Sequence, residues 1–262
     1  GYRAVFARLE ELIRAAGGDI RLGVTVERIE PRPGGGLVVA HDQRREAFDK
    51  VIFTSPVSVL QHVAGRELVG VANGQGGVEY LGVVCGVLVT RKPLVPYYIV
   101  NIADGRIPFT GVIGMSNLVS PQELAGYHLT YLPKYVLSDD PFLRQTDDEL
   151  RRVFGEGLRV MFPDLDAAGI QSLHVNRAFK VQPLQVLNYS TLVPRVTTRH
   201  EDFFVLNTAQ FVNATLNNNE VARAVDEFLS DYGDRLEGHA LAAGAPAARQ
   251  APRLRGSTVG HT

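Results

Sequence analysis

Three consecutive asparagines in the C-terminal part of the chain have the residue type and the position needed to place free backbone N–H groups beside a ligand. Asn217, Asn218 and Asn219 stand directly before apolar residues at helical spacing, which are Val221, Ala222, Val225, Phe228 and Leu229. Asn217 is a favourable N-cap, and Glu220 three residues later completes the spacing of a capping box. Because the first N–H groups of a helix have no partner within it, this end suits an anionic or electron-rich ligand.

The element that must position this helix is a short buried strand. Phe203 to Leu206 is an apolar run of β-forming residues, and a polar loop from Asn207 to Asn217 carries the chain on to the helix. A strand that leads to a helix N-terminus in this way can form a ligand site, with Ala209 and Gln210 in the loop. The same unit also occurs as plain structure with asparagines as turn residues, so the pattern leaves both interpretations open.

A helix followed by strands opens the chain. Apolar residues repeat at helical spacing from Tyr2 to Ala16, and Gly17-Gly18 ends the helix. Alternation and short apolar runs then predict strands over residues 20–30, 37–40 and 51–53. We expect the helix to cover one face of the sheet and to shield Val24 and Val26 from water. The last strand ends at Thr54-Ser55-Pro56, where the proline stops it.

The C-terminal stretch resembles the flavin-binding segment of the FAD-dependent amine oxidase and protoporphyrinogen oxidase-like flavoproteins. In that family the final helix directs its N-terminus at the isoalloxazine ring. The usual Gly-Asp before the loop is replaced here by Asn207-Thr208-Ala209-Gln210. The run TLNNNEV, residues 215–221, is closer to the bacterial branch of mutase-like NAD(P)/FAD-dependent oxidoreductases. The resemblance implies FAD as the cofactor.

The N-terminal block resembles the same group of flavoproteins. Val26 matches a valine whose backbone meets the adenine, and Asp49 to Pro56 matches the segment that closes the nucleotide-binding sheet. Pattern alone favours an ordinary α-β-β unit here, whereas both blocks in the right order favour the flavoprotein. The resemblance then implies these cofactor-binding residues: Val26, Thr54, Ser55, Pro56, Ala209, Gln210, Asn217, Asn218 and Asn219.

Between these blocks the sequence changes to closely spaced strand patterns separated by turns. Strands are predicted over residues 80–90, 97–102, 109–115, 127–131 and 170–181. Asp104-Gly105 is a hairpin signal, and Thr146 with Glu149 forms a capping box before a helix that Pro163 ends. An antiparallel sheet with a covering helix matches the substrate domain that the family inserts between its nucleotide-binding segments.

The resemblance therefore implies a fold and a domain order. We expect an α/β (α+β) chain, with a partial FAD/NAD(P)-binding Rossmann-like domain and an inserted antiparallel-sheet substrate domain. The segments would be residues 1–70 (partial FAD-binding), 71–183 (substrate-binding), 184–237 (C-terminal FAD-binding) and 238–262 (a disordered tail). Because the family places its pocket on the sheet, Tyr97 and Tyr131 are the candidate substrate-binding residues.

The glycine motif that holds a dinucleotide pyrophosphate has no match in a suitable place. That motif, G-x-G-x-x-G, follows a strand and opens a helix. Gly74-Gln75-Gly76-Gly77 lies in a predicted loop, and Gly155-Glu156-Gly157 lies within a predicted helix. We therefore expect the N-terminal dinucleotide-binding half to be missing from this chain, and we expect the chain alone to bind FAD poorly.

Composition argues against several other classes of protein. The net charge is −1 at pH 7 and no basic stripe occurs, so nucleic acid is not an expected partner. The single cysteine, Cys85, excludes an internal disulfide, and neither it nor the scattered histidines has metal-ligand spacing. No apolar run approaches a membrane span and no secretory leader opens the chain, so we expect a cytoplasmic protein.

The leading hypothesis is an FAD-dependent oxidoreductase that removes a hydride from a C–N or C–C bond of a small, partly apolar substrate. Flavin catalysis needs few protein groups, because the cofactor carries the redox chemistry. The sequence accordingly identifies no catalytic residue. Two alternatives remain open: a flavin-dependent mutase without net redox turnover, and a non-enzymatic remnant that has lost the glycine motif.

Overall fold

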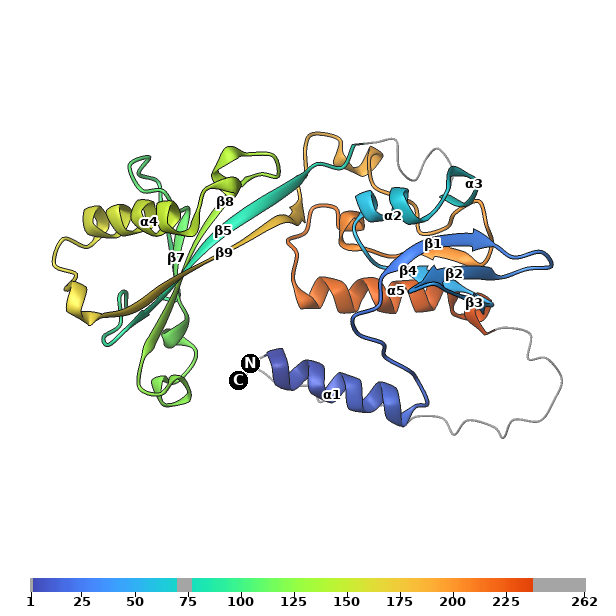
Figure 1. The fold of residues 1–262 in the computed structure, drawn as a ribbon, viewed down its shortest axis with the longest axis horizontal. Helices are drawn as coiled ribbons and strands as arrows, with labels where there is room; N and C mark the ends of the chain where they lie inside the picture. The colour runs from blue at the N-terminus through green and yellow to red at the C-terminus, as the bar shows by residue number, and fades with distance from the viewer. Residues whose placement is uncertain (1, 70–76, 238–262) are drawn as a thin grey trace, which may run out of the picture.

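The computed structural model describes residues 2–69 and 77–237, which fold as two bodies joined by two long strands (Figure 1). One body holds the N-terminal and C-terminal elements, and the other holds the middle of the chain. The strands that connect the bodies are β5 (Tyr80–Thr90) and β9 (Ile170–Pro183). Gly74 to Gly76 of the predicted glycine-containing loop lie outside the described residues. So does the tail from residue 238, which was predicted to be disordered.

The first body contains two small sheets. Strands β1 (Val26–Pro31), β2 (Leu37–His41) and β3 (Arg44–Phe48) form an antiparallel sheet in that order. Strands β4 (Val51–Phe53) and β10 (Phe203–Val205) pair in parallel, although they are far apart in the sequence. Among the described residues β10 is the only partner of β4 in its sheet.

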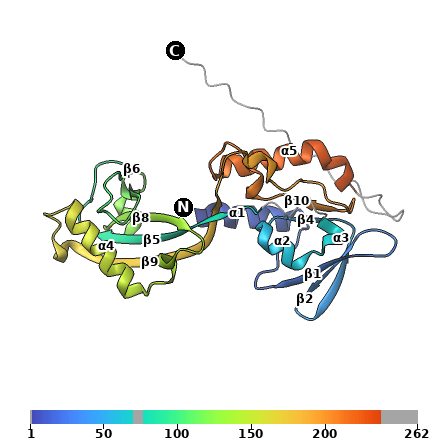
Figure 2. The ribbon, with the colours of Figure 1, turned by 90° about the horizontal axis from the view of Figure 1, so that it is seen from above.

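The β4–β10 pair lies between two layers (Figure 2). On one face Phe203 and Val205 join a core formed with β1, β2, α2 (Val57–Val63) and α3 (Arg66–Val69). On the other face lies α5 (Asn218–Leu236), and Phe204 meets its Phe228 edge to face, with 5.6 Å between the ring centroids. Phe204 also lies 5.7 Å from the Tyr232 ring. This aromatic cluster fixes the position of α5 on the sheet.

A partly buried ion pair ties the start of β4 to the start of β10. The Lys50 Nζ lies 2.7 Å from the Asp202 Oδ1, and the Gly36 N–H donates to the Asp202 Oδ2 at 2.9 Å. Burial alone would raise the pKa of Asp202, but the hydrogen bonds from Lys50 and Gly36 and the charge of Lys50 lower it overall. Gly36 has φ of +74°, and a Cβ there would lie 2.5 Å from the Phe48 carbonyl oxygen, so this close approach requires glycine.

The second body is a five-stranded antiparallel sheet with α4 on one face (Figure 1). The strand order is β6-β7-β8-β5-β9, with β6 (Ile99–Asn101), β7 (Gly111–Gly114) and β8 (His128–Leu137). Helix α4 (Asp147–Met161) begins with the predicted capping box, in which Thr146 and Glu149 satisfy each other's backbone N–H groups. Phe154 of α4 is fully buried and stacks on Phe109 at 5.8 Å. Short 3₁₀ turns fill the connections: η2 (Met115–Asn117), η3 (Pro121–Leu124), η4 (Pro141–Arg144), η5 (Ala167–Gly169), η6 (Tyr189–Thr191) and η7 (Thr208–Gln210).

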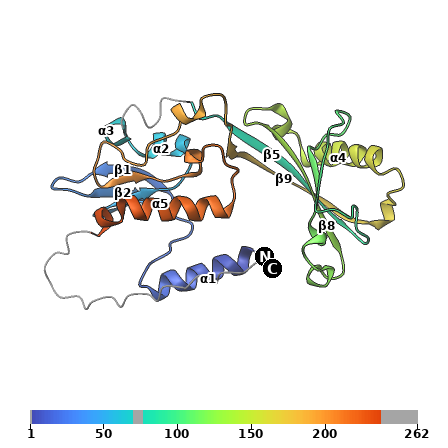
Figure 3. The same cartoon turned by 180° about the vertical axis from the view of Figure 1, so that it is seen from behind.

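Two expectations about the N-terminal block are wrong. Helix α1 (Tyr2–Ala15) covers no sheet face, because none of its residues is buried and it stands clear of both bodies (Figure 3). Val26 is accordingly 39% exposed. The predicted strand over 20–30 begins only at Val26, since residues 20–25 pair with no described strand and alternation alone cannot form a ladder.

The Asp104-Gly105 turn forms, with the Ile107 N–H donating to the Asp104 carbonyl at 3.1 Å, but it sits in a longer loop than a two-residue hairpin.

Candidate functional site

The two sequence blocks that suggested a ligand site meet at one edge of the β4–β10 pair. Because the strands are parallel, the segments that leave their carboxyl ends lie together. The Leu206 N–H donates to the Phe53 carbonyl at 2.9 Å. One step further, the Asn207 side-chain amide donates to the Ser55 carbonyl at 3.1 Å. Residues 54–56 and 206–210 thus form one edge, although about 150 residues separate them along the chain.

Asn207 organises this edge through a turn that the sequence reading did not identify. Its Oδ1 accepts the Ala209 N–H at 3.0 Å, while the Gln210 Oε1 accepts the Asn207 N–H at 2.8 Å. The Gln210 amide also donates to the carbonyls of Val205 (3.0 Å) and Pro194 (3.2 Å). The Oε1 and the amide nitrogen of the Gln210 side chain are therefore both hydrogen-bonded to the backbone. The signal for this capping box was available in the sequence, because Asn207 and Gln210 have the spacing of an N-cap and its third helical residue.

Tyr189 holds the same turn from the other side. Its hydroxyl donates to the Ala209 carbonyl at 2.7 Å, and both residues are buried. Burial, with a further contribution from the nearby Tyr80, raises the pKa of Tyr189 to about 12. The hydroxyl therefore keeps its proton at neutral pH and remains a hydrogen-bond donor. Ala209, which was predicted to bind the cofactor, therefore has both its backbone N–H and its carbonyl hydrogen-bonded.

A groove of about 660 Å³ brings three of the predicted residues together. Val26, Thr54 and Ser55 line it, and Pro56 follows as the N-cap of α2. The remaining lining is mostly apolar and comes from β1 to β4, α2 and the residues just before β1 and β4: Val24, Thr25, Ile29, Val39, Phe48, Lys50, Val51, Ile52, Phe53, Val59 and Val63. This volume lies within the range of small-ligand sites, and mostly apolar walls with a few polar groups are typical of such sites.

The predicted helix N-terminus forms, but only half of its capping box does. The Asn217 Oδ1 accepts the Glu220 N–H at 3.0 Å, and its amide donates to the Thr215 carbonyl at 3.0 Å. The Glu220 carboxylate instead binds Arg223 and does not return to Asn217. Asn218 and Asn219 are exposed in the first turn of α5. Their N–H groups point out of the helix end without intrahelical partners, so they can donate to a ligand.

The N-terminal end of α5 lies toward the five-stranded sheet (Figure 1). Between them is an open cavity of about 320 Å³. Leu81 and Gln182 line it from the base of the sheet, and Asn213, Ala214 and Thr215 line it from the loop before α5. A ligand in this cavity would contact both the five-stranded sheet and the loop of residues 211–217 before α5, which we call the asparagine loop.

The two predicted substrate-binding tyrosines lie farther from this cavity than other residues of the same sheet. Tyr131 pairs with Val87, and Tyr97 is 66% exposed in the loop before β6. On the same face as Tyr131, which α4 does not cover, Tyr135 lies four residues nearer the junction, about 14 Å along the strand. Leu137 pairs with Leu81, a residue of the cavity wall. The structure therefore brings Tyr135 and Leu137 closer to α5 than Tyr97 and Tyr131.

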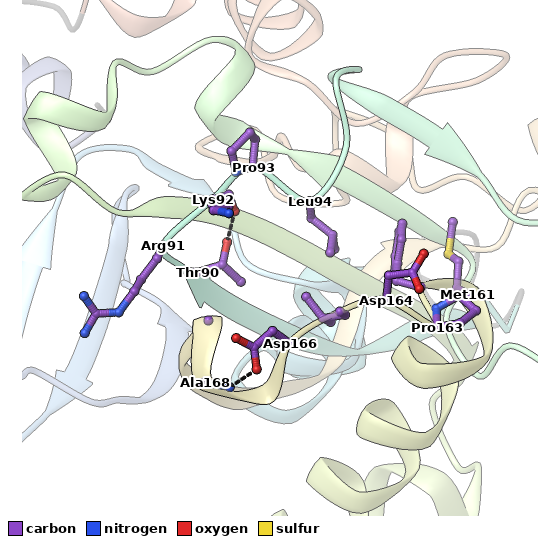
Figure 4. A pocket seen from close by; sticks show the side chains of 13 residues that line it. Thr90, Arg91, Lys92, Pro93, Leu94, Met161, Pro163, Asp164, Asp166 and Ala168 are labelled. Atoms are coloured by element: carbon purple, nitrogen blue, oxygen red, sulfur yellow. Dashed lines mark hydrogen bonds between the residues drawn. The ribbon is translucent and has the colours of Figure 1, made fainter.

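A second large cavity lies at the opposite end of β5 (Figure 4). It measures about 570 Å³ and lies between residues 90–94 and 161–169. The Thr90 hydroxyl donates to the Lys92 carbonyl at 2.6 Å, and the Asp166 carboxylate accepts the Ala168 N–H at 2.9 Å. None of the residues predicted to bind a cofactor or substrate lines this cavity.

Within residues 2–69 and 77–237, no group of three or more His, Cys, Asp or Glu side chains is arranged to hold a metal ion. In the same residues no helix is both long enough and apolar enough to cross a membrane.

Comparison with known proteins identifies a family. The family model of flavin-containing amine oxidoreductases matches residues 1–212. No curated protein matches the chain.

Solved structures with the same fold are distant in sequence. An oxidoreductase from Methanosarcina mazei is 19% identical with a TM-score of 0.67, and 88% of this chain covers 54% of that chain. A protein assigned as a protoporphyrinogen oxidase from Exiguobacterium sp. 255-15 is 14% identical with a TM-score of 0.69, and the coverages are 89% and 51%. Reduced UDP-galactopyranose mutase is 15% identical with a TM-score of 0.52, and the coverages are 68% and 38%. The chain thus spans about half the length of the first two structures and a smaller share of the third.

Proposed function

The chain belongs to the family of flavin-containing amine oxidoreductases, and on that premise we propose that it supplies the C-terminal part of an FAD-dependent oxidoreductase. Its reaction would be the removal of a hydride from a C–N or C–C bond of a small, partly apolar substrate. The observation that carries this proposal is the junction of three features. The loop that leads into α5 and the base of the five-stranded sheet line one cavity, and the same loop follows directly on the turn that joins the Asn207 edge to the carboxyl end of β10.

The described residues fit FAD in two places. The groove between residues 24–26 and β4 is walled by strand edges that the dinucleotide-binding segment would pair with, so that segment would fill part of it, and the remaining space beside Val26, Thr54 and Ser55 would receive the adenosine end. The first turn of α5 offers N–H groups and the positive end of a helix dipole for the isoalloxazine end. When bound, FAD would accept the hydride and the electron pair that the substrate loses.

The chain's own residues would orient the reactants and exclude water. Asn217 caps α5 and keeps its first turn in place, so that the N–H groups of Asn218 and Asn219 can stabilise negative charge. The apolar face that includes Leu81, Tyr135 and Leu137 would hold the apolar part of the substrate. Neither role requires a charged acid or base.

We also propose that a dinucleotide-binding segment completes the first body. Helix α1 exposes a full apolar face, formed by Tyr2, Val5, Phe6, Leu9, Leu12 and Ile13. Residues 20–25 keep a strand pattern without a described partner, and one edge of β4 has no partner strand in the described part of the chain. A strand followed by a glycine-rich turn and a helix could pair with these edges, cover α1 and hold the pyrophosphate.

A mutase without net redox turnover is the second candidate. The observation that favours it is the fold shared with UDP-galactopyranose mutase. Both candidates use the same flavin site, so they differ in what the substrate does there. A third candidate, a non-enzymatic remnant, rests on the absent glycine motif.

An anaerobic absorption spectrum distinguishes these candidates. The chain completed with its dinucleotide-binding segment and loaded with FAD would be mixed with a panel of small amines and apolar alcohols. We expect at least one compound to bleach the oxidised flavin, because net hydride transfer leaves the flavin reduced when oxygen is absent. A flavin that stays oxidised with every compound, yet turns over a sugar nucleotide after chemical reduction, would favour the mutase instead.

A further inference from the structure

One side chain holds the loop before α5 in place. The Gln185 amide nitrogen donates to the carbonyls of Phe211 (3.0 Å) and Ala214 (2.9 Å). Its Oε1 accepts the Asn213 N–H at 3.0 Å. Both amide hydrogens and the carbonyl oxygen of this side chain are thus bound to the backbone of a four-residue stretch, residues 211–214. A single amide closes this loop.

The loop needs such a clamp. Residues 211–217 form neither helix nor strand, and Asn213 has φ of +55°, in the left-handed region that most residues avoid. Asn217, which caps α5, lies four residues after Asn213. The direction in which α5 presents its first turn therefore depends on the conformation of this stretch.

Gln185 is anchored to the other body. It lies two residues after β9 ends at Pro183, which pairs with Tyr80 at the start of β5. The Leu184 N–H donates to the Glu79 carbonyl at 2.8 Å, so the residue before Gln185 is fixed to the base of the five-stranded sheet. Gln185 therefore connects the five-stranded sheet to the asparagine loop. It also lines the cavity of about 320 Å³ between them.

We propose that Gln185 is a positioning residue for the flavin site, which fixes the loop of residues 211–217 and sets where the first turn of α5 stands relative to the sheet. It touches neither the predicted cofactor residues nor the substrate face, and it acts through Asn213 and Asn217. This inference rests on the proposed function, because it assumes that α5 faces the flavin.

The test replaces Gln185 with methionine, which keeps the length and volume of the side chain and removes all three hydrogen bonds. The matched control is Gln171→Met, because Gln171 is exposed near the start of β9, lies outside the cavity that Gln185 lines and makes no hydrogen bond through its side chain among the described residues. Two readouts are measured. Hydrogen exchange of the amides of residues 213–217 is followed by mass spectrometry in the chain itself, and FAD affinity and reduction potential are measured in the chain completed with its dinucleotide-binding segment.

In Gln185→Met we expect exchange at residues 213–217 to be about tenfold faster, since each net hydrogen bond lost weakens local closure. We expect FAD to bind about tenfold more weakly with a shifted reduction potential. Gln171→Met should match the unmodified protein in both readouts. Unchanged exchange in Gln185→Met would overturn the inference, and so would faster exchange with unchanged FAD affinity and potential while Asn218→Asp alters them. If neither Gln185→Met nor Asn218→Asp alters FAD binding or potential, the proposed flavin site itself is wrong and the inference fails with it.

Discussion

Residues 1–262 alone are expected to purify without bound FAD, and joining the dinucleotide-binding segment is expected to raise FAD affinity by a factor of about 100 or more. The described residues offer a groove for the adenosine end and a helix N-terminus for the ring. They offer no glycine-rich turn for the pyrophosphate between those ends. Two hydrogen bonds to a charged group, at about 1.5 kcal/mol each, already correspond to roughly 100-fold in affinity.

This prediction is checked by titrating FAD into each protein and following the quenching of flavin fluorescence. Far-ultraviolet circular dichroism of the shorter protein serves as the control, because an unfolded chain would also fail to bind. A folded, stoichiometrically yellow protein from residues 1–262 alone would contradict the prediction.

The second large effect concerns the layer between α5 and the β4–β10 pair. Phe204 is fully buried between Phe228 and Tyr232, and the Arg235 guanidinium lies 4.8 Å from its ring centroid. Phe204→Ala should lower the free energy of unfolding by about 3–5 kcal/mol, because it leaves a cavity and removes the aromatic contacts. Domains commonly have about 5–15 kcal/mol in total, so this variant would be close to unfolding at ordinary temperatures.

Urea denaturation followed by circular dichroism measures this change. Phe179→Ala is the matched control, because Phe179 is 49% exposed in β9 and its loss should change stability by less than about 1 kcal/mol. If Phe204→Ala unfolds at the same urea concentration as the control, the aromatic cluster does not anchor α5.

The sequence predicts well those elements whose signal is local. The bounds of β4, β5 and α4 match the prediction, since apolar alternation and the Thr146 capping box depend on neighbouring residues alone. The parallel pairing of β4 with β10 is different. It joins residues about 150 positions apart and follows only from the family resemblance, because no local pattern selects a distant partner.

Where the sequence reading fails, the physical cause is the missing information about partners. Strand β3 has the sequence RREAF, and its charges hide a strand that ion pairs support, such as Arg45 with Glu30 of β1 and Glu46 with Arg21 of the segment before β1. Conversely, residues 20–25 have a strand pattern but no described strand beside them. Helix α1 likewise has an apolar face that packs on nothing described.

The candidate site shows the same division. The capped N-terminus of α5 and the position of residues 54–56 after a short strand were predictable from residue types and spacing, whereas the expected burial of that strand is wrong for Ile52, which is 40% exposed. The clamp by Gln185 was not, because its partners lie 26 to 29 residues away and its hydrogen bonds depend on how a loop folds back. The assignments of Tyr97 and Tyr131 to the substrate and of the nine residues to FAD remain predictions.

The reduction potential of bound FAD in Asn218→Asp most directly tests whether α5 faces the flavin. Asp and Asn both suit a helix start, so the free energy of unfolding without cofactor should change by less than about 1 kcal/mol. If the first turn of α5 faces the ring, the new carboxylate opposes the negative charge of the reduced flavin. In the chain completed with its dinucleotide-binding segment, we expect a lower reduction potential and weaker FAD binding. An unchanged potential and an unchanged affinity, in a protein of unchanged stability, would show that the asparagine loop is only a helix cap.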